Sequence, residues 1–203
     1  MQTLILPSYF PSISNMVAVA NGKDLILEVD DNFQKQTNRT RTYIYSPNGT
    51  QTLTIPVKHA NGLGQKTKDV KIENDFDWQK QHLKSLEAAY RSSPFFEYFE
   101  DELIPIFSKK HTFLLDLNFE SLELCFKLLR LEKSYKKTVE YFREPKNTLD
   151  YRTLVDGKKD QSEFDNYSQV FKTKFGFINN LSVLDLIFND GKFALDYLKE
   201  QKL

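Results

Sequence analysis

The sequence predicts a mixed α/β fold, with an amino-terminal mixed sheet that contains a βαβ unit and a hairpin, followed by a mainly helical carboxyl-terminal part. Three observations predict this class. Two short apolar runs, residues 4–6 and 25–29, lie on either side of a short helical pattern. The pair Asn48-Gly49 separates two segments rich in β-branched and aromatic residues. After Asp75 the apolar residues recur at intervals of three and four, which is the period of a helix.

The first 30 residues have the pattern of a βαβ unit. The run Leu-Ile-Leu at residues 4–6 ends at Pro7, which is typical of a short buried strand. Ser14 is placed to cap a short helix that ends at Asn21-Gly22, and residues 25–29 form the second strand. Strands connected in this way are parallel, with a right-handed crossover.

Residues 42–57 have the alternation of a β-hairpin. Apolar and aromatic side chains at 43–45 and 53–55 flank the pair Asn48-Gly49. This pair favours a tight hairpin turn because both residues accept a positive φ. The Val-Lys-Ile segment at residues 70–72 is expected to add one more short strand.

Three helices are expected between residues 75 and 131. The first starts near Asp75, and its inner stripe consists of Trp78, His82, Ser85 and Ala89. Ser93-Pro94 is expected to begin the second helix, which Pro105 ends or kinks. The third is expected to begin at Asn118, where Leu117 and Leu122 have the spacing of a hydrophobic staple.

The remaining chain divides by composition. Residues 132–165 are polar and rich in turn formers, so we expect a long, mobile connection with little regular structure. Ser182 and Asp185 have capping-box spacing and predict a helix, and a last helix follows from about Lys192. The expected organisation is an α/β core at 1–131, the connection at 132–165, and a helical tail at 166–203 that packs on the core.

Composition excludes several classes of function. Lysine plus arginine and aspartate plus glutamate are equal at 28 each, so no overall positive field exists to gather nucleic acid. The single cysteine, Cys125, rules out an internal disulfide and a cysteine-type zinc site. The start lacks a signal-peptide pattern, and no apolar stretch reaches the ~20 residues of a membrane helix. The cytoplasm is therefore the expected compartment.

Topology predicts a site beyond the carboxyl ends of the two parallel strands, where open α/β sheets bind ligands. The loops at residues 7–11 and 30–41 leave from that edge and are expected to face each other across a crevice. Lys35, Arg39 and Arg41 in the second loop suit an anionic ligand such as a nucleotide diphosphate. The alternative is a solvated loop in which the arginines pair with acidic neighbours at 30–31.

His82 is the candidate acid–base residue, because a histidine titrates near neutral pH. The alternative is a structural histidine within an apolar stripe. Ser85 lies one turn later, but nothing in the sequence provides the orienting acid or oxyanion hole that a nucleophilic serine needs. Arg91 either complements the dipole at its helix end or reaches the anion site. His59, His82 and His111 lack metal-ligand spacing, so neither a metal nor a cofactor is expected.

Several motifs together resemble the WbqC-like family over most of the chain. They are Leu6-Pro7-Ser8-Tyr9-Phe10-Pro11, Asp31-x-x-Gln34-Lys35, Asn38-Arg39-x-Arg41, Leu53-Thr54-Ile55-Pro56-Val57, Trp78-x-x-x-His82-x-x-Ser85, Tyr90-Arg91-x-x-Pro94-x-Phe96 and the segment from Asn180 to Phe188 with Gly191. The usual family opening is Gln-Pro-x-Tyr, and Leu6 replaces that glutamine here. The resemblance implies a link to bacterial surface polysaccharides such as O-antigen, and a transferase role that adds an aminoacyl or acyl group to an amino sugar.

The leading hypothesis is therefore a transferase for an anionic small molecule, either a nucleotide-sugar or an activated acid. Its catalytic residues would be His82, as the general base, and Asp31, which would orient the histidine or the acceptor. The expected substrate-binding residues are Tyr9, Gln34, Lys35, Arg39, Arg41, Trp78, Ser85, Tyr90 and Arg91. This mechanism requires His82 and the two arginines of the loop to meet at one cavity. The alternative is a non-catalytic module that binds an anionic ligand or a partner protein.

Overall fold

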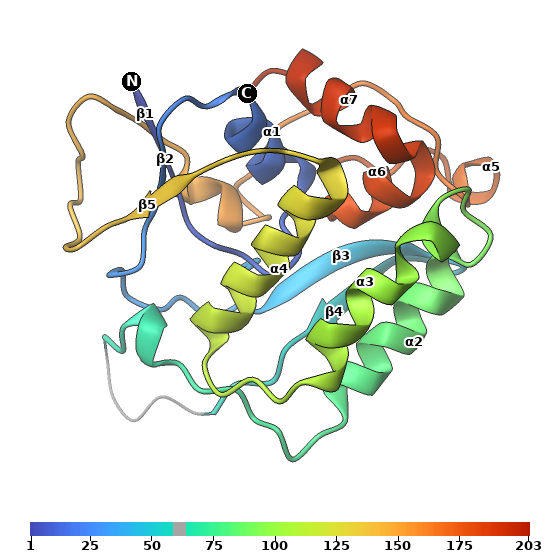
Figure 1. Ribbon diagram of the computed structural model, residues 1–203, viewed down its shortest axis with the longest axis horizontal. Helices are drawn as coiled ribbons and strands as arrows, with labels where there is room; N and C mark the ends of the chain where they lie inside the picture. Colours follow the sequence, from blue (N-terminus) through green and yellow to red (C-terminus); the bar gives the residue numbers. More distant parts are fainter. Residues whose placement is uncertain (59–63) are drawn as a thin grey trace.

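The computed structural model describes residues 1–58 and 64–203, which contain a four-stranded parallel sheet (Figure 1). Its spatial order is β5-β2-β1-β6. The strands are β1 (Gln2–Ile5), β2 (Leu25–Leu27), β5 (Tyr135–Lys137) and β6 (Thr148–Asp150). A separate two-stranded antiparallel sheet and a mainly helical later part complete the fold. The predicted mixed α/β class is confirmed.

The predicted βαβ unit is present as β1, α1 (Ile13–Asn21) and β2, and the two strands pair in parallel. The cap of the helix differs from the prediction. The Ser12 hydroxyl accepts a hydrogen bond from the backbone N–H of Asn15, so Ser12 is the N-cap in place of Ser14. Ser14 lies inside the first turn, where its hydroxyl donates to Asp160 at 2.5 Å.

Gly22 ends α1 at a point where the chain passes very close to β1. Its backbone is extended, with φ of −69°, so no unusual dihedral requires glycine here. A Cβ atom at this position would lie 2.4 Å from Oγ1 of Thr3 and 2.7 Å from the carbonyl oxygen of Ala18. The glycine is therefore required by the close approach of helix and strand.

The prediction of little regular structure in residues 132–165 is wrong, because β5 and β6 form the two edges of the parallel sheet. A short 3-10 helix, η2 (Arg152–Val155), follows β6. Each of these strands has only three residues, and most of their side chains are exposed. Edge strands this short and polar lack the apolar alternation by which a strand is detected. The expected mobility of this segment, and the three-part division of the chain, remain predictions.

The predicted hairpin is confirmed as β3 (Arg41–Ser46) and β4 (Gly49–Thr54), with Gly49 at a φ of 93°. The further strand expected at residues 70–72 is wrong. In its place, η1 (Thr67–Asp69) is followed by isolated bridges from Lys71 to Phe113 and from Ile72 to Val57.

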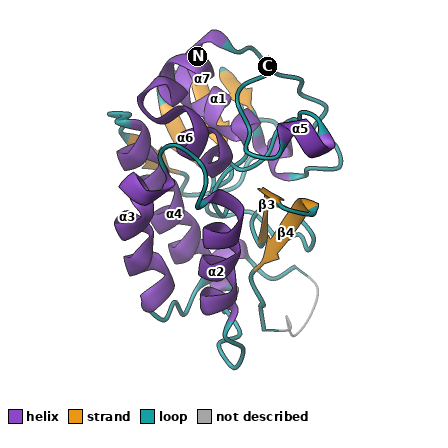
Figure 2. Ribbon diagram, turned by 90° about the vertical axis from the view of Figure 1, so that its right-hand side faces the viewer, coloured by secondary structure: helices purple, strands orange, loops and turns teal. Residues whose placement is uncertain are grey.

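Three helices follow the hairpin, namely α2 (Trp78–Tyr90), α3 (Phe96–Ser108) and α4 (Leu114–Leu129). Figure 2 shows α2 between the hairpin and α3, and its contacts with β3 and α3 agree. All three helices are predicted, but α3 begins at Phe96 and not at Ser93-Pro94. Two further boundaries differ. Pro105 does not end α3, and α4 begins four residues before Asn118.

Burial explains both differences. Leu103, Ile106 and Phe107 are buried on either side of Pro105, so packing on the core stabilises the helix across a residue that lacks an N–H. Leu114 and Leu115 are also buried, and they extend the apolar face of α4 towards the amino terminus. Tertiary packing therefore overrides the local signals at both positions.

The tail contains α5 (Lys172–Phe175), α6 (Val183–Asp190), η3 (Gly191–Phe193) and α7 (Ala194–Glu200). The last helices contact α1 and α4. Ser182 caps α6 as predicted, because its hydroxyl accepts from the N–H of Leu184 at 3.3 Å. Asp185 does not complete the capping box, since its carboxylate accepts from the Tyr167 hydroxyl at 2.6 Å. Within the described ranges, no helix combines the length and the apolar character that crossing a bilayer requires.

Candidate functional site

A cavity of about 410 Å³ lies beyond the carboxyl ends of the parallel strands. Its walls come from the residue after β1, the loop after β2, the loop after β5, and the end of β6 with η2. From β1 the chain adds β2 and then β5 on one side of β1, and it later adds β6 on the other side. The direction of strand addition therefore reverses between β1 and β6, which makes this a topological switch point. Open α/β sheets bind ligands at this position.

The cavity is rich in basic groups, although the whole chain has a formal net charge of zero. Five basic residues line it, against three acidic ones, which leaves two positive charges in excess. The basic residues are Arg39, Lys66, Arg143, Arg152 and Lys159, and the acidic ones are Asp31, Asp150 and Asp156. Gln34 and Asn32 add neutral polar groups. This composition favours an anionic ligand.

Asp31 and Arg39 form a buried ion pair in the wall of the cavity. Nη1 of Arg39 donates to Oδ2 of Asp31 and, at 2.9 Å, to the Thr67 hydroxyl. Burial lowers the pKa of the Arg39 guanidinium, and the Asp31 carboxylate opposes that change. Oδ1 of Asp31 is buried and has no hydrogen-bond partner among the described residues. A buried carboxylate oxygen of this kind takes its hydrogen bond from solvent or a ligand.

Arg152 uses all five of its N–H donors to fasten the loop after β5 to the sheet. Nε and Nη2 form a fork on the Asp150 carboxylate, at 2.9 and 2.6 Å. Nη1 reaches Oε2 of Glu28 at 3.4 Å, and the carbonyls of Phe142 and Arg143 accept the remaining bonds. Hydrogen bonding to Asp150 is the main reason that the pKa of Arg152 is raised. Arg152 therefore positions the loop and has no free donor for a ligand.

Arg143 differs from the other cations of the cavity. Lys66 is bonded to Asp30, and Lys159 lies 3.2 Å from Asp156. The exposed Arg143 side chain has neither an ion pair nor a hydrogen bond to any residue of the ranges 1–58 and 64–203. Its guanidinium is therefore the group most available to form a bidentate contact with a carboxylate or phosphate.

Sequence reasoning missed Arg143 and Arg152 because it assigned them to an unstructured connection. The hint that was available is the pair Asp150-x-Arg152, in which opposite charges lie two residues apart. That spacing is common, so it identifies the pair only once β6 is known.

The predicted site residues Tyr9, Trp78 and His82 form a buried cluster away from this cavity. The Tyr9 hydroxyl lies 2.9 Å from Nδ1 of His82, and the Trp78 and His82 rings are 5.2 Å apart with T-shaped geometry. Burial lowers the pKa of His82 to about 4, against a smaller opposing effect of a hydrogen bond with the Thr54 backbone. Burial also raises the pKa of Tyr9 well above its ordinary value. His82 is therefore neutral at physiological pH.

The expected meeting of His82 with Asp31 and the arginines does not occur, because the loop at residues 7–11 turns into the core. Its backbone groups are bonded from three directions. Asn118 and Ser121 of α4, Thr42 of β3 and Ser182 of the α6 cap all reach it. Phe10 is completely buried at a φ of 39°, an unfavourable value for an aromatic residue. None of residues 7–11 lines the cavity, whereas Leu6, directly before this loop, does.

The other predicted binding residues are dispersed. Ser85 accepts a hydrogen bond from Gln51, the Tyr90 hydroxyl accepts one from the N–H of Tyr45, and exposed Arg91 pairs with Glu100. Lys35 lines a shallow hollow beside residues 54–58, and Arg41 is half-buried in β3 outside the cavity. Among all the predicted site residues, the structure brings Asp31, Gln34 and Arg39 together at the cavity.

In the part of the chain that the structure describes, no group of three or more histidine, cysteine or acidic side chains is arranged to hold a metal ion. Nε2 of His111 is bonded to the carbonyl of Ile106 at 2.9 Å, and His59 lies outside the described residues.

Fold and site together define an α/β protein with a cationic ligand cavity at the switch point of its parallel sheet. The chain belongs to the WbqC-like protein family, whose model matches residues 7–162. That range contains every residue lining the cavity except Leu6. The uncharacterized protein Rv1507c of Mycobacterium tuberculosis is 26% identical to this chain over 223 residues, which cover 97% of this chain and 96% of the relative. No solved structure matches the chain.

Proposed function

We propose that this WbqC-like protein is a transferase that binds an anionic, activated substrate in the cavity at the carboxyl edge of its sheet, as part of bacterial surface-polysaccharide synthesis. The observation that carries the proposal is the excess of basic side chains around that cavity, together with the unpaired guanidinium of Arg143 among the described residues. The link to polysaccharide synthesis rests on the resemblance to the family.

Arg143 anchors the anionic end of the substrate, which is a phosphate or a carboxylate. Lys66 and Lys159 also line the cavity and add positive charge, although Asp30 pairs with the first and Asp156 with the second. Arg152 acts through its neighbours, because it fixes the loop that presents Arg143. Holding the substrate at a fixed orientation is a large part of the rate enhancement of a transfer reaction.

In this proposal, Asp31 orients the acceptor and then receives its proton. Its Oδ2 is fixed by Arg39, and the unpartnered Oδ1 accepts a hydrogen bond from the amine or hydroxyl of the acceptor. The acceptor lone pair forms a bond to the carbonyl carbon of the activated acid. The bond to the leaving group then breaks with its electrons on the leaving group, and the acceptor proton passes to Asp31. His82 does not line the cavity, so it has no part in this step.

The test begins with binding of inorganic pyrophosphate, measured by calorimetry at low ionic strength. Arg143→Gln is expected to weaken binding by about tenfold, which is the value of one charge-assisted bidentate contact. The matched control is Arg91→Gln, because Arg91 is an exposed arginine paired with Glu100 on another face. Equal effects of the two substitutions on pyrophosphate affinity would show that the cavity is not the anion site.

Turnover separates a transferase from the alternative, a binding module without chemistry. The burial of His82, which removes the expected imidazole base from the cavity, favours that alternative. The purified protein is incubated with a nucleotide-linked amino sugar and an activated acyl or aminoacyl donor, and the mass of the sugar is followed. A transferase produces an acylated sugar that Asp31→Asn does not produce. Pyrophosphate binding without any mass gain supports the binding module.

A further inference from the structure

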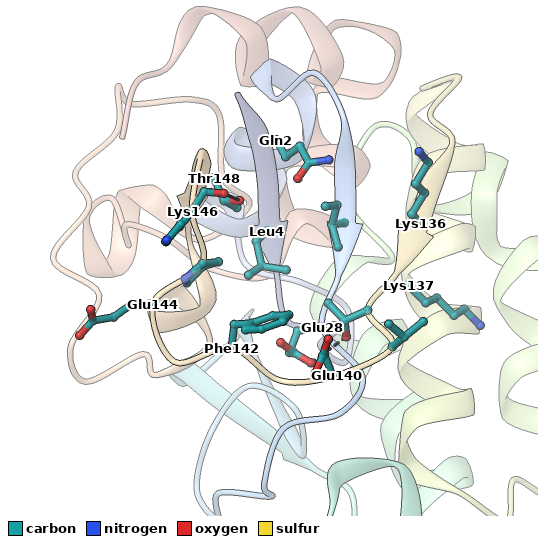
Figure 3. A pocket seen from close by; sticks show the side chains of 14 residues that line it. Gln2, Leu4, Glu28, Lys136, Lys137, Glu140, Phe142, Glu144, Lys146 and Thr148 are labelled. Atoms are coloured by element: carbon teal, nitrogen blue, oxygen red, sulfur yellow. Dashed lines mark hydrogen bonds between the residues drawn. The ribbon is translucent and has the colours of Figure 1, made fainter.

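A second cavity, of about 630 Å³, lies on the open face of the parallel sheet (Figure 3). Parallel sheets are normally covered on both faces. Here Leu4 of β1 and Ile26 of β2 form an apolar floor, and the loop after β5 provides Val139, Phe142 and Pro145. Figure 3 shows Phe142 reaching in from the loop beside Leu4. The charged residues of its lining are Lys136, Lys137, Lys146, Glu140, Glu144 and Glu28, of which Glu28 is buried and pairs with Arg152.

The two cavities adjoin along the same strands. Leu4 lines the sheet-face cavity and Leu6 lines the carboxyl-edge cavity, and side chains two residues apart on an extended chain point to the same side. The same relation holds for Thr148 and Asp150 of β6. Two residues along a strand span only about 7 Å, so one small molecule can reach from one cavity into the other.

The loop after β5 is a thin wall shared by the two cavities. The residues of this loop alternate between the two cavities. Glu140, Phe142 and Glu144 line the sheet-face cavity, whereas Tyr141 and Arg143 line the carboxyl-edge cavity. The base of the wall is the ion pair between Glu28, which lines one cavity, and Arg152, which lines the other. An apolar hollow and a free guanidinium are therefore presented from opposite sides of one short segment.

We infer that the substrate is an amphiphilic anion, whose charged end binds at Arg143 and whose apolar chain lies on Leu4 and Ile26 under Phe142. The inference rests on the proposed function for the charged end and adds the substrate class. Cavity size supports it, since both hollows have volumes within the ~300–1,000 Å³ of small-molecule sites. The apolar floor and Phe142 support an uncharged chain, because Leu4, Ile26 and Phe142 offer no charged partner to a second anionic group.

The experiment compares the affinities of methyl phosphate and octyl phosphate, the latter below its micelle concentration, by calorimetry. The longer chain is expected to increase affinity at least about tenfold, because each buried methylene contributes favourably. Phe142→Ser and Ile26→Thr are each expected to remove most of that gain without changing methyl phosphate binding. Phe193→Ser is the matched control, because Phe193 is 59% exposed, close to the 57% of Phe142, and lies outside the cavity.

The outcomes separate the two proposals. Equal affinity for the two phosphates, or a gain that survives both Phe142→Ser and Ile26→Thr, overturns the apolar subsite and leaves the anion site intact. Failure of methyl phosphate to bind, with octyl phosphate bound independently of Arg143, overturns the anion site of the proposed function. A gain lost in both cavity variants and kept in Phe193→Ser supports the amphiphilic substrate.

Discussion

The hydroxyl of Tyr9 and Nδ1 of His82 lie 2.9 Å apart, although 73 residues separate them in the chain. This contact joins the loop after β1 to the inner face of α2. Both side chains are buried, so neither can replace its partner by bulk water. The pair therefore fixes the position of α2 on the core, and it explains why a loop that follows a strand at the binding edge is directed inwards.

Tyr9→Phe is expected to destabilise the protein by roughly 1–3 kcal/mol, because Nδ1 of His82 is left buried without its partner. His82→Gln should also reduce the free energy of unfolding and leave pyrophosphate affinity unchanged. Urea unfolding at pH 7.5 measures the first effect and calorimetry the second. If His82→Gln has native stability but no turnover, the histidine belongs to the catalytic machinery after all.

His82 also gives stability a dependence on pH. Its pKa is about 4 in the folded state, below the ordinary value of 6.5, so the folded state resists protonation. The contribution is fully present above pH 6.5 and is lost as the pH falls towards 4. The difference in unfolding free energy between wild type and His82→Gln should therefore decrease on acidification. A constant difference from pH 7.5 to 4.5 would show that His82 is not buried as described.

Asp185 is expected to act in the opposite direction. Burial raises its pKa to about 6, so its favourable contribution is present below pH 3.8 and is lost as the pH rises through 6. Relative to Asp185→Asn, the wild type should lose up to roughly 3 kcal/mol of stability between pH 4 and 7.5. The amide keeps an acceptor for the Tyr167 hydroxyl. Parallel pH profiles of the two proteins in urea unfolding would contradict this assignment.

Arg152→Lys should loosen the loop at residues 138–147. A lysine cannot reproduce the fork on Asp150 or the two bonds to loop carbonyls, and it leaves Glu28 buried with a weakened partner. We expect a loss of roughly 3 kcal/mol in stability and faster hydrogen exchange in this loop. Arg143→Lys is the control, since its side chain holds no loop in place. Unchanged exchange in the Arg152 variant would mean that other contacts hold the wall.

Gly22→Ala tests the close approach of α1 to β1. The backbone of Gly22 accepts alanine, so any effect arises from the 2.4 Å contact with Thr3 and the 2.7 Å contact with the Ala18 carbonyl. A destabilisation of roughly 1–3 kcal/mol is expected, as for other overpacked sites. Thermal unfolding of Gly22→Ala and of Thr3→Ala/Gly22→Ala, which removes the Oγ1 atom nearest the new methyl group, measures the loss and its partial recovery.

The sequence identified the elements with strong periodic patterns. The βαβ unit, the hairpin and α2 were predicted because long apolar stripes and turn residues mark them. The edge strands β5 and β6 were not predicted. Each has three mostly exposed residues, which take their structure from the neighbouring strand rather than from a pattern of their own. Eight of the 14 residues that line the cavity lie in residues 132–165, the segment that contains these strands.

The sequence predicted where the site lies better than it predicted which residues line it. Parallel strands alone placed it at their carboxyl ends, and Asp31, Gln34 and Arg39 lie there. Tyr9 was assigned to it through the family motif and His82 because a histidine titrates near neutral pH. Their burial depends on long-range packing, which the sequence pattern does not give. Sequence periodicity gives the face of a helix but not what covers that face.

The position of β6 has a consequence for synthesis of the protein. Until the nascent chain has passed Asp150, β1 has β2 on one side and an unpaired edge on the other, and the backbone groups of Gln2 and Leu4 await partners. The ribosome must therefore deliver three-quarters of the chain before the sheet can close. Folding of this kind is slow, because its decisive contacts join distant segments, and the waiting edge is a natural target for chaperones.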